Sequence, residues 1–330
     1  MAIHVKRTST ILKPDQTRVL LRPFNPGDAE RIAGIVERIV ALPEDEVGLL
    51  LDGISTEFSQ RHRQIRNRFL ERFEQIRDLV AFDRNVSEQR RLLIGSYFLA
   101  EYSLESAALF NPSIVPDPDQ AGLPVGALRF ILSLRATGEG HISSITFRSG
   151  VIHRDQKIEM SPPVGFLTEP RQIPNPVYEK ALFERKLSEL NLTSGFTQRV
   201  LNKVADSFTL QELSSALEAE PHGRSDGMIQ EDENAAKGIW LLAKSNYEVQ
   251  FQLGQTMSER IIFPVTPSQR NGIEDARFVC FHNDDGTVVY YATYTAFDGS
   301  AVVPELLETS DFLLFRFRTC LLYTSPSPRD

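Results

Sequence analysis

The sequence predicts a mainly β fold with α-helical additions, and three observations lead to this prediction. About eight short apolar segments with strand-like patterns follow residue 104, and they do not alternate one by one with helices. Helical periodicity is instead concentrated in two regions, residues 1–104 and about 176–245. The segment Thr287–Phe297 is largely apolar on both strand faces, which favours stacked antiparallel sheets such as propeller blades over a sandwich.

The first region is predicted to be an α-helical extension. Residues 24–28, Phe-Asn-Pro-Gly-Asp, are typical of a capped helix start, and apolar residues recur at helical spacing until Pro43 stops the pattern. A longer helix is expected from about Ser55 to Val80, and another from Ser87 to about Leu104. Arginines in the longer helix are interleaved with glutamates, which favours a solvated helix face over a polyanion site.

The remaining chain is predicted to be one β-rich domain over residues 105–318, with the helical segment 176–245 as an insertion. Its strands are expected at residues 130–135, 142–147, 247–253, 260–265, 287–297 and 312–317. Two turns support this reading: Thr137–His141 joins the first two strands, and Asp284–Gly286 forms a later hairpin. Residues 319–330 continue no pattern, so we expect a non-native tail that interrupts a longer protein.

Composition and charge exclude several classes of function. The chain has 330 residues, 41% apolar and 24% charged, with a net charge of −8 and a pI near 5.4. Such an acidic protein is not expected to bind nucleic acid. The two cysteines form no metal-binding spacing and no disulfide framework. We expect a cytoplasmic protein without a membrane partner, because no signal peptide and no apolar run of about 20 residues is present.

Polar or charged side chains cluster at the ends of predicted strands in the segments Phe110–Ser113, Leu134–His141 and Gly272–Arg277, and the last two segments also contain glycine. Strand alternation puts Asp275 and Arg277 on one face and Glu274 on the other. A carboxylate beside a guanidinium suits proton transfer to a bound oxyanion or sugar. Neither a metal site nor a phosphate loop is predicted, because no ligand spacing or loop-to-helix pattern fits.

Four segments together resemble glycoside hydrolase family 130, the β-mannoside phosphorylases and β-mannosidases. They are Phe110-Asn-Pro-Ser, Leu134-Arg, Gly272-Ile-Glu-Asp-Ala-Arg and Tyr294-Thr-Ala-Phe-Asp-Gly. The resemblance covers roughly residues 105–155 and 245–318, and Ala276 stands where the family usually has proline. It implies a five-bladed β-propeller, of which this chain would supply about two blades.

The resemblance also implies roles. Asp275 would be the catalytic acid, while Asn111, Arg135 and Arg277 would hold the mannosyl unit. Inorganic phosphate would be the co-substrate, with no other cofactor, and a β-mannoside oligosaccharide would be cleaved with inversion to α-mannose 1-phosphate. Arg148 and His141 are further candidates for binding the phosphate. Because other phosphate ligands would lie in missing blades, we expect the 330-residue chain alone to be inactive.

Two alternatives stay open. The first is a β-mannoside hydrolase of the same fold, in which acidic residues replace the phosphate-binding cations. The second is a non-catalytic carbohydrate-binding or assembly module, in which the helices mediate homo-oligomerisation. Release of mannose 1-phosphate rather than mannose separates the first alternative from a phosphorylase, and replacement of Asp275 by asparagine separates the second from an enzyme.

Overall fold

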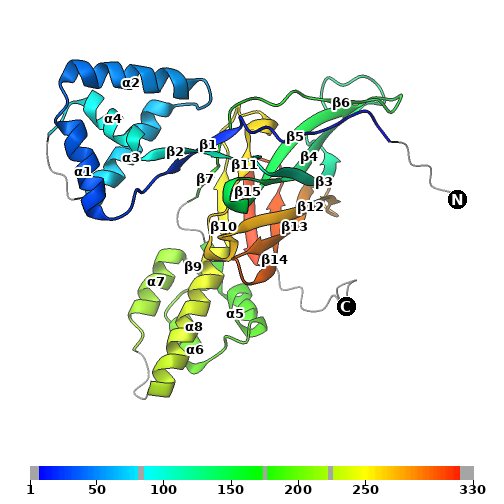
Figure 1. Ribbon diagram of the computed structural model, residues 1–330. Coiled ribbons are helices and arrows are strands. Elements are labelled where there is room, and N and C mark those ends of the chain that lie inside the picture. The colour runs from blue at the N-terminus through cyan, green and yellow to red at the C-terminus, as the bar shows by residue number, and fades with distance from the viewer. Residues whose placement is uncertain (1–6, 81–84, 174–176, 222–225, 320–330) are drawn as a thin grey trace.

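A computed structural model describes residues 7–80, 85–173, 177–221 and 226–319. The protein is mixed α/β, with about 36% helix and 31% strand, so the prediction of a mainly β fold understated the helical share. A helical unit lies at each of two sides of a central body of β-sheet (Figure 1). A closed barrel or propeller is not seen among the described residues.

The N-terminal unit has four helices and a two-stranded sheet around its own core. Its elements are β1 (Val19–Pro23), α1 (Ala29–Val40), α2 (Glu44–Ser59), α3 (Ile65–Leu79), α4 (Glu88–Tyr97) and β2 (Leu99–Ser103). Asp28 caps α1 by accepting a hydrogen bond from the amide of Arg31, which confirms the predicted capped start. The antiparallel pair of β1 and β2 connects this unit to the central body.

Two helix predictions in this unit were wrong in their bounds. The long helix expected from Ser55 to Val80 is broken, because α2 ends at Ser59 and α3 begins only at Ile65. At the break, Gln64 has a left-handed backbone (φ 53°), and Arg61 and His62 both bind Glu101. The helix expected from Ser87 to Leu104 ends at Tyr97, and the chain continues into β2, whose strand partner β1 the sequence pattern did not predict.

The central body consists of two antiparallel meanders. The first sheet is β3 (Ala108–Pro116), β4 (Leu128–Thr137), β5 (Ser143–Ile152) and β6 (Ile158–Met160), with β11 (Ile261–Ile262) also on β5. The second sheet is β12 (Gly272–His282), β13 (Val288–Phe297), β14 (Val302–Thr309) and β15 (Leu314–Thr319), extended by β10 (Tyr247–Gln250) and β7 (Arg171–Gln172). One parallel residue pair, Gly272 with Ser143, joins the two sheets.

A shared aromatic core lies between the two sheets. Phe147 of the first sheet contacts three rings of the second: it stacks on Phe315 and meets Phe278 and Phe312 edge-on. All four side chains are buried. Burying a phenylalanine stabilises the fold by about 1.5–3 kcal/mol, so this cluster is a main contribution to holding the sheets together.

The second sheet is buried on one face only. On β13, Tyr290, Ala292 and Tyr294 are buried, whereas Tyr291 is half-buried and Thr293 is exposed. The prediction that this strand is covered on both faces was therefore wrong for the described residues, since no described element packs over the outer face to bury it. The predicted hairpin around residues 284–286 is confirmed between β12 and β13.

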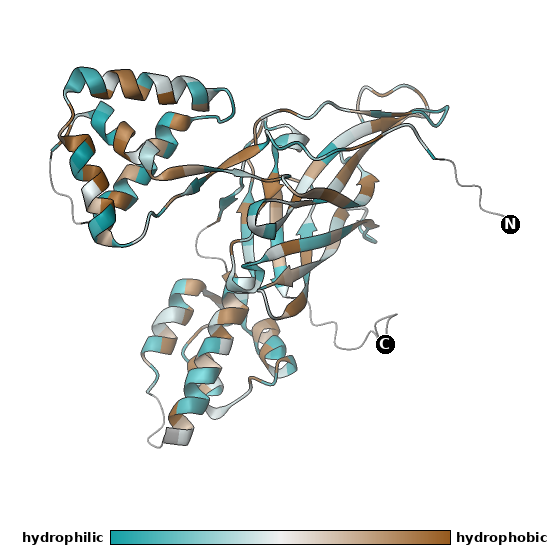
Figure 2. Cartoon of the chain, viewed as in Figure 1, coloured by the Kyte–Doolittle hydropathy of each residue, from teal (hydrophilic) through white to brown (hydrophobic). Residues whose placement is uncertain are grey.

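The second helical unit also has its own core. It comprises β8 (Val177–Glu179), α5 (Lys180–Glu189), α6 (Gly195–Leu201), β9 (Ser207–Thr209), α7 (Leu210–Glu218) and α8 (Asp226–Ser245). Thr209 and Glu212 form a capping box at the start of α7. Hydrophobic and hydrophilic residues alternate along these helices (Figure 2), and α5 to α8 confirm the helical character predicted for about residues 176–245.

Two further predictions, on membrane spans and on the C-terminal tail, can be compared with the structure over the described residues only. No helix among them combines the length and the apolar character needed to span a bilayer. The predicted tail begins at Thr319, which is the last residue of β15, and the rest of it lies outside the described residues.

Candidate functional site

The candidate site forms where the first strands of the two sheets lie side by side. Each of these strands contains a β-bulge: in β3 the register shifts between Phe110 and Ser113, and in β12 it shifts between Glu274 and Arg277. Bulges bend a strand and redirect its side chains, and they are common beside functional sites. The segments Phe110–Ser113, Leu134-Arg135 and Gly272–Arg277 therefore meet at the junction of the two sheets.

Asn111 and Asp275 occupy equivalent positions in the two bulges. Each is the fourth residue of its strand, and each has a left-handed backbone, with φ of 53° and 54°. Asparagine and aspartate tolerate this conformation better than other non-glycine residues, but it still costs energy. The side chain of Asn111 donates a hydrogen bond to Oδ1 of Asp275 across the junction of the sheets. Strained residues of this kind are concentrated at functional sites.

Arg135 supplies the cation of the site from β4. Its Nη1 lies 3.4 Å from Oδ1 of Asp275, and its Nη2 donates to Oε1 of Glu274 at 2.6 Å. Its Nε donates to Oγ of Ser143 at 2.9 Å, and its guanidinium lies 4.9 Å from the centre of the Phe110 ring. With all three nitrogens held, the guanidinium has a fixed orientation.

The predicted alternation of Glu274, Asp275 and Arg277 was wrong. Glu274 and Asp275 both reach Arg135, so they point to the same side, because the bulge inserts an extra residue and breaks the two-residue period. Arg277 is exposed and donates from Nη1 to the carbonyl oxygen of Pro112 at 2.8 Å. It links the two bulges at the rim and is not paired with Asp275.

One oxygen of Asp275 is left for a ligand. Oδ1 accepts from Asn111 and faces Arg135, whereas Oδ2 accepts no hydrogen bond from the described part of the chain. The side chain is 40% exposed, compared with 20% for Arg135 and 20% for Glu274. A carboxyl group that is anchored through one oxygen and open at the other can exchange a proton with a bound molecule.

The two other predicted residues do not join this cluster. His141 is exposed in the turn between β4 and β5, and none of the hydrogen bonds or ion pairs of the described residues links it to Asp275. Arg148 is buried on β5, but its neighbour Phe147 faces the shared core, so Arg148 points to the opposite side of the first sheet. There Arg148 binds Glu105 at 2.7 Å.

Sequence reasoning missed the roles of three residues. Glu274 and Ser143 hold Arg135, and only the bulge and the strand pairing bring them to it. Tyr294, part of the fourth segment, is not exposed at the site: its hydroxyl donates to the buried carboxylate of Glu305 and accepts from Gln269 at 3.0 Å. Burial, followed by the Glu305 charge, holds the pKa of Tyr294 well above its usual value. These interactions make Tyr294 a core residue.

Among the described residues no group of three histidine, cysteine, aspartate or glutamate side chains could hold a metal ion. Comparisons with protein-family models, curated proteins and solved structures find no significant match to this chain.

Proposed function

We propose that the cluster around Asp275 is a glycoside-processing site that acts on β-linked mannosides, with Asp275 as the general acid. The observation that carries the proposal is the carboxylate with one open oxygen, placed between the amide of Asn111 and the guanidinium of Arg135. Amide and guanidinium groups bind sugar hydroxyls well, and a positioned carboxyl group transfers protons.

The two meanders are, in this proposal, two blades of a five-bladed propeller. Neighbouring blades are four-stranded antiparallel sheets whose first strands line a common axis. The first strands β3 and β12 lie side by side, and Arg277 bonds Pro112 while the amide of Phe278 bonds Oγ of Ser113 at 2.9 Å. The equivalent bulges at Asn111 and Asp275 support a repeated unit, since blades repeat one structural pattern.

The proposed reaction is phosphorolysis with inversion. An oxygen of inorganic phosphate forms a bond to the anomeric carbon while the glycosidic C–O bond breaks. Asp275 supplies the proton of the leaving oxygen, relayed by the mannose 3-hydroxyl, and the products are α-mannose 1-phosphate and the shortened sugar. Because phosphate is the nucleophile, the second carboxylate that activates water in an inverting hydrolase is not needed. Asn111 and Arg135 hold the mannosyl unit.

A hydrolase on the same fold is the nearest alternative. It would use the same acid but needs a carboxylate that activates water, about 6.5–9.5 Å from the acid in inverting enzymes. Glu274 contacts the same guanidinium as Asp275, but it is bound to Arg135 at 2.6 Å and holds the guanidinium. That pairing favours a structural role for Glu274, and the product assay described below separates the two reactions.

A non-catalytic sugar-binding or assembly module is the other alternative. Such a module needs Asn111 and Arg135 to grip the ligand, but it has no use for a proton donor. An enzyme with the substitution Asp275→Asn should keep its sugar affinity and lose its turnover, whereas a binding module should show no turnover with or without the substitution and should keep its sugar affinity.

The test is a product assay on the longer protein that the five-bladed proposal requires, of which these residues would supply two blades. The protein is incubated with β-1,4-mannobiose with and without inorganic phosphate, and the sugars released are separated by anion-exchange chromatography. The proposal expects mannose 1-phosphate only when phosphate is present. Free mannose in both arms would establish the hydrolase, and no product with any β-mannoside would overturn a catalytic function.

A further inference from the structure

A pocket on the other side of the first sheet is separate from the Asp275 site. It has a volume of about 400 Å³ and lies between the N-terminal segment, residues 10–15, and the segment that follows β6. The lining residues that matter for binding are Ile11, Leu12, Lys13, Asp15, Arg148 and Met160. This volume suits a small molecule, and the lining combines apolar walls with a few charged groups, as ligand pockets generally do.

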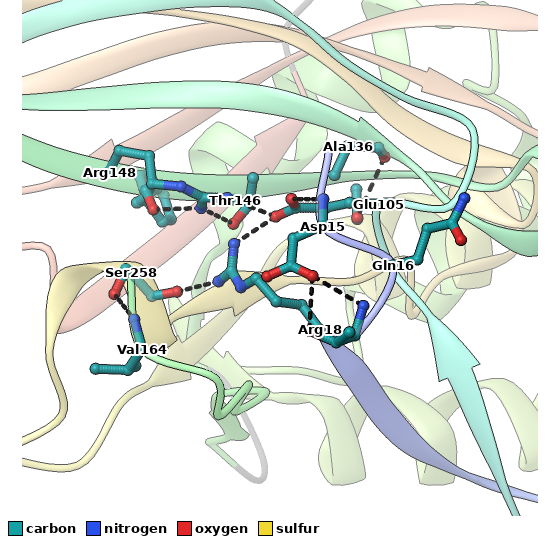
Figure 3. Close-up of polar contacts among 12 residues, drawn as sticks. Asp15, Gln16, Arg18, Glu105, Ala136, Thr146, Arg148, Val164 and Ser258 are labelled. Carbon is teal, nitrogen blue, oxygen red and sulfur yellow. Dashed lines mark hydrogen bonds and ion pairs between the residues drawn. The ribbon is translucent and has the colours of Figure 1, made fainter. Parts of the chain in front are cut away.

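The wall of the pocket is built on a buried cluster of charges (Figure 3). Oε1 of Glu105 accepts from both Arg18 and Arg148, and its Oε2 accepts from the amide of Asp15 at 3.1 Å. Arg18 and Glu105 have no exposed surface, and Arg148 is 3% exposed. One carboxylate thus serves two guanidinium groups in a region from which water is excluded.

Positive charge is in excess around the pocket. The buried cluster and the pocket lining together hold three cations, Arg18, Arg148 and Lys13, and two carboxylates, Glu105 and Asp15. Nε of Arg18 is buried without a hydrogen-bond partner among the described residues. Burial, and next the positive charge of Arg148, lower the pKa of Arg18 to about 10. Buried cations that are not fully neutralised favour an incoming anion.

Arg148 has donors to spare for a ligand. Nη1 donates to Oγ1 of Thr146 and to the carbonyl oxygen of Phe147, and Nη2 donates to Glu105. Within the described part of the chain, these three bonds use three of the five N–H donors of the Arg148 guanidinium. Lys13 is exposed at the pocket, and no ion pair of the described residues involves it.

We propose that this pocket binds a small organic anion, with one carboxylate or phosphate group held by Arg148 and Lys13 and a compact apolar body against Ile11, Leu12 and Met160. The negative charge of Asp15 restricts the ligand to a single anionic group. Because the pocket bridges the N-terminal segment and the first sheet, binding also holds residues 10–15 against β5. This proposal is independent of the function of the Asp275 site.

The test uses four probes on the 330-residue protein: butyrate, n-butyl phosphate, inorganic phosphate and the neutral 1-butanol. Binding is measured by isothermal titration calorimetry, and amide hydrogen exchange of residues 10–15 gives a second readout. At least one butyl anion should bind at least tenfold more tightly than 1-butanol and slow the exchange. The two butyl anions distinguish a carboxylate from a phosphate ligand, and inorganic phosphate tests the need for the apolar body.

Matched variants locate the binding. Lys13→Gln should weaken anion affinity by about threefold or more, since one cation near the ligand is lost. Arg148→Lys keeps the buried charge but loses the planar fork, and should weaken it further. Lys157→Gln, an exposed change in the β5–β6 turn outside the lining, should have no effect. Equal binding of 1-butanol, no saturable binding, or equal effects of Lys13→Gln and Lys157→Gln would overturn the proposal, and these comparisons hold even if Arg148→Lys fails to fold.

Discussion

The side chain of Asn111 donates a hydrogen bond to Asp275, and both residues hold a left-handed backbone at equivalent bulges of two neighbouring strands. The strain at each position is offset by the contacts that the bulge permits. Three strands, β3, β4 and β12, thereby bring the amide of Asn111 and the guanidinium of Arg135 into contact with the carboxylate of Asp275.

The backbone and side-chain roles of Asn111 can be separated by two substitutions. Asn111→Gly removes the side chain but suits the positive φ, whereas Asn111→Ala also forces alanine into a left-handed conformation. We expect Asn111→Ala to unfold at lower denaturant than Asn111→Gly, with a difference of about 1–2 kcal/mol in the free energy of unfolding. Both should bind mannoside more weakly than the unchanged protein. Equal stability of the two variants would contradict the assigned backbone strain.

Glu274 is expected to act through Arg135 rather than on the substrate. In the longer protein that the five-bladed proposal requires, Glu274→Gln weakens the hold on the guanidinium, so KM for the mannoside should rise several-fold while kcat changes little. The matched control is Glu308→Gln, which weakens an ion pair with Arg316 on the second sheet and should leave both constants unchanged. A fall in kcat without a change in KM would instead identify Glu274 as a participant in the chemical step.

The Glu105 cluster should dominate the stability of the contact between the N-terminal segment and the first sheet. Glu105→Gln leaves Arg18 and Arg148 buried without a carboxylate, which should cost about 3–5 kcal/mol in the free energy of unfolding. Glu88→Gln, which breaks an exposed pair with Arg66, should cost less than about 1 kcal/mol. Chemical denaturation measures both, and a similar small cost for each variant would show that the cluster is not a structural requirement.

Glu305 should make stability fall as pH rises. Burial raises the pKa of this carboxyl above its usual value. The folded protein therefore binds a proton that the unfolded chain releases, so the stabilisation is complete below pH 4.5 and is lost as pH rises through the raised pKa. Glu305→Gln keeps the shape without the charge. Its stability relative to the unchanged protein should increase from pH 4 to pH 8, and a difference independent of pH would contradict this account.

The sequence predicted the elements that depend on local patterns. The capped start of α1 follows from its side-chain cap and helical spacing, and the hairpin before β13 follows from its turn residues, because each is encoded within a few residues. The break between α2 and α3 was not predictable in this way. There Arg61 and His62 bind Glu101, about 40 residues away, and such a contact leaves no local pattern.

The candidate site was predictable in its residues but not in its geometry. Asn111, Arg135 and Asp275 come together as expected. The period-two rule failed at the Asp275 bulge, and it misassigned Glu274, since a left-handed residue within a strand has no signature in an alternating pattern. Arg148 was misassigned because its side of the sheet depends on which face the shared core covers.

The central claim is that Asp275 is a general acid, and the rate of β-1,4-mannobiose phosphorolysis by Asp275→Asn, made in the longer protein that the five-bladed proposal requires, tests it most directly. Asparagine keeps the shape and tolerates the left-handed backbone, so sugar affinity should be retained, whereas turnover should fall by at least about 100-fold. Asp284→Asn, an exposed change in the hairpin turn, should match the unchanged protein. Undiminished turnover in Asp275→Asn would contradict the account.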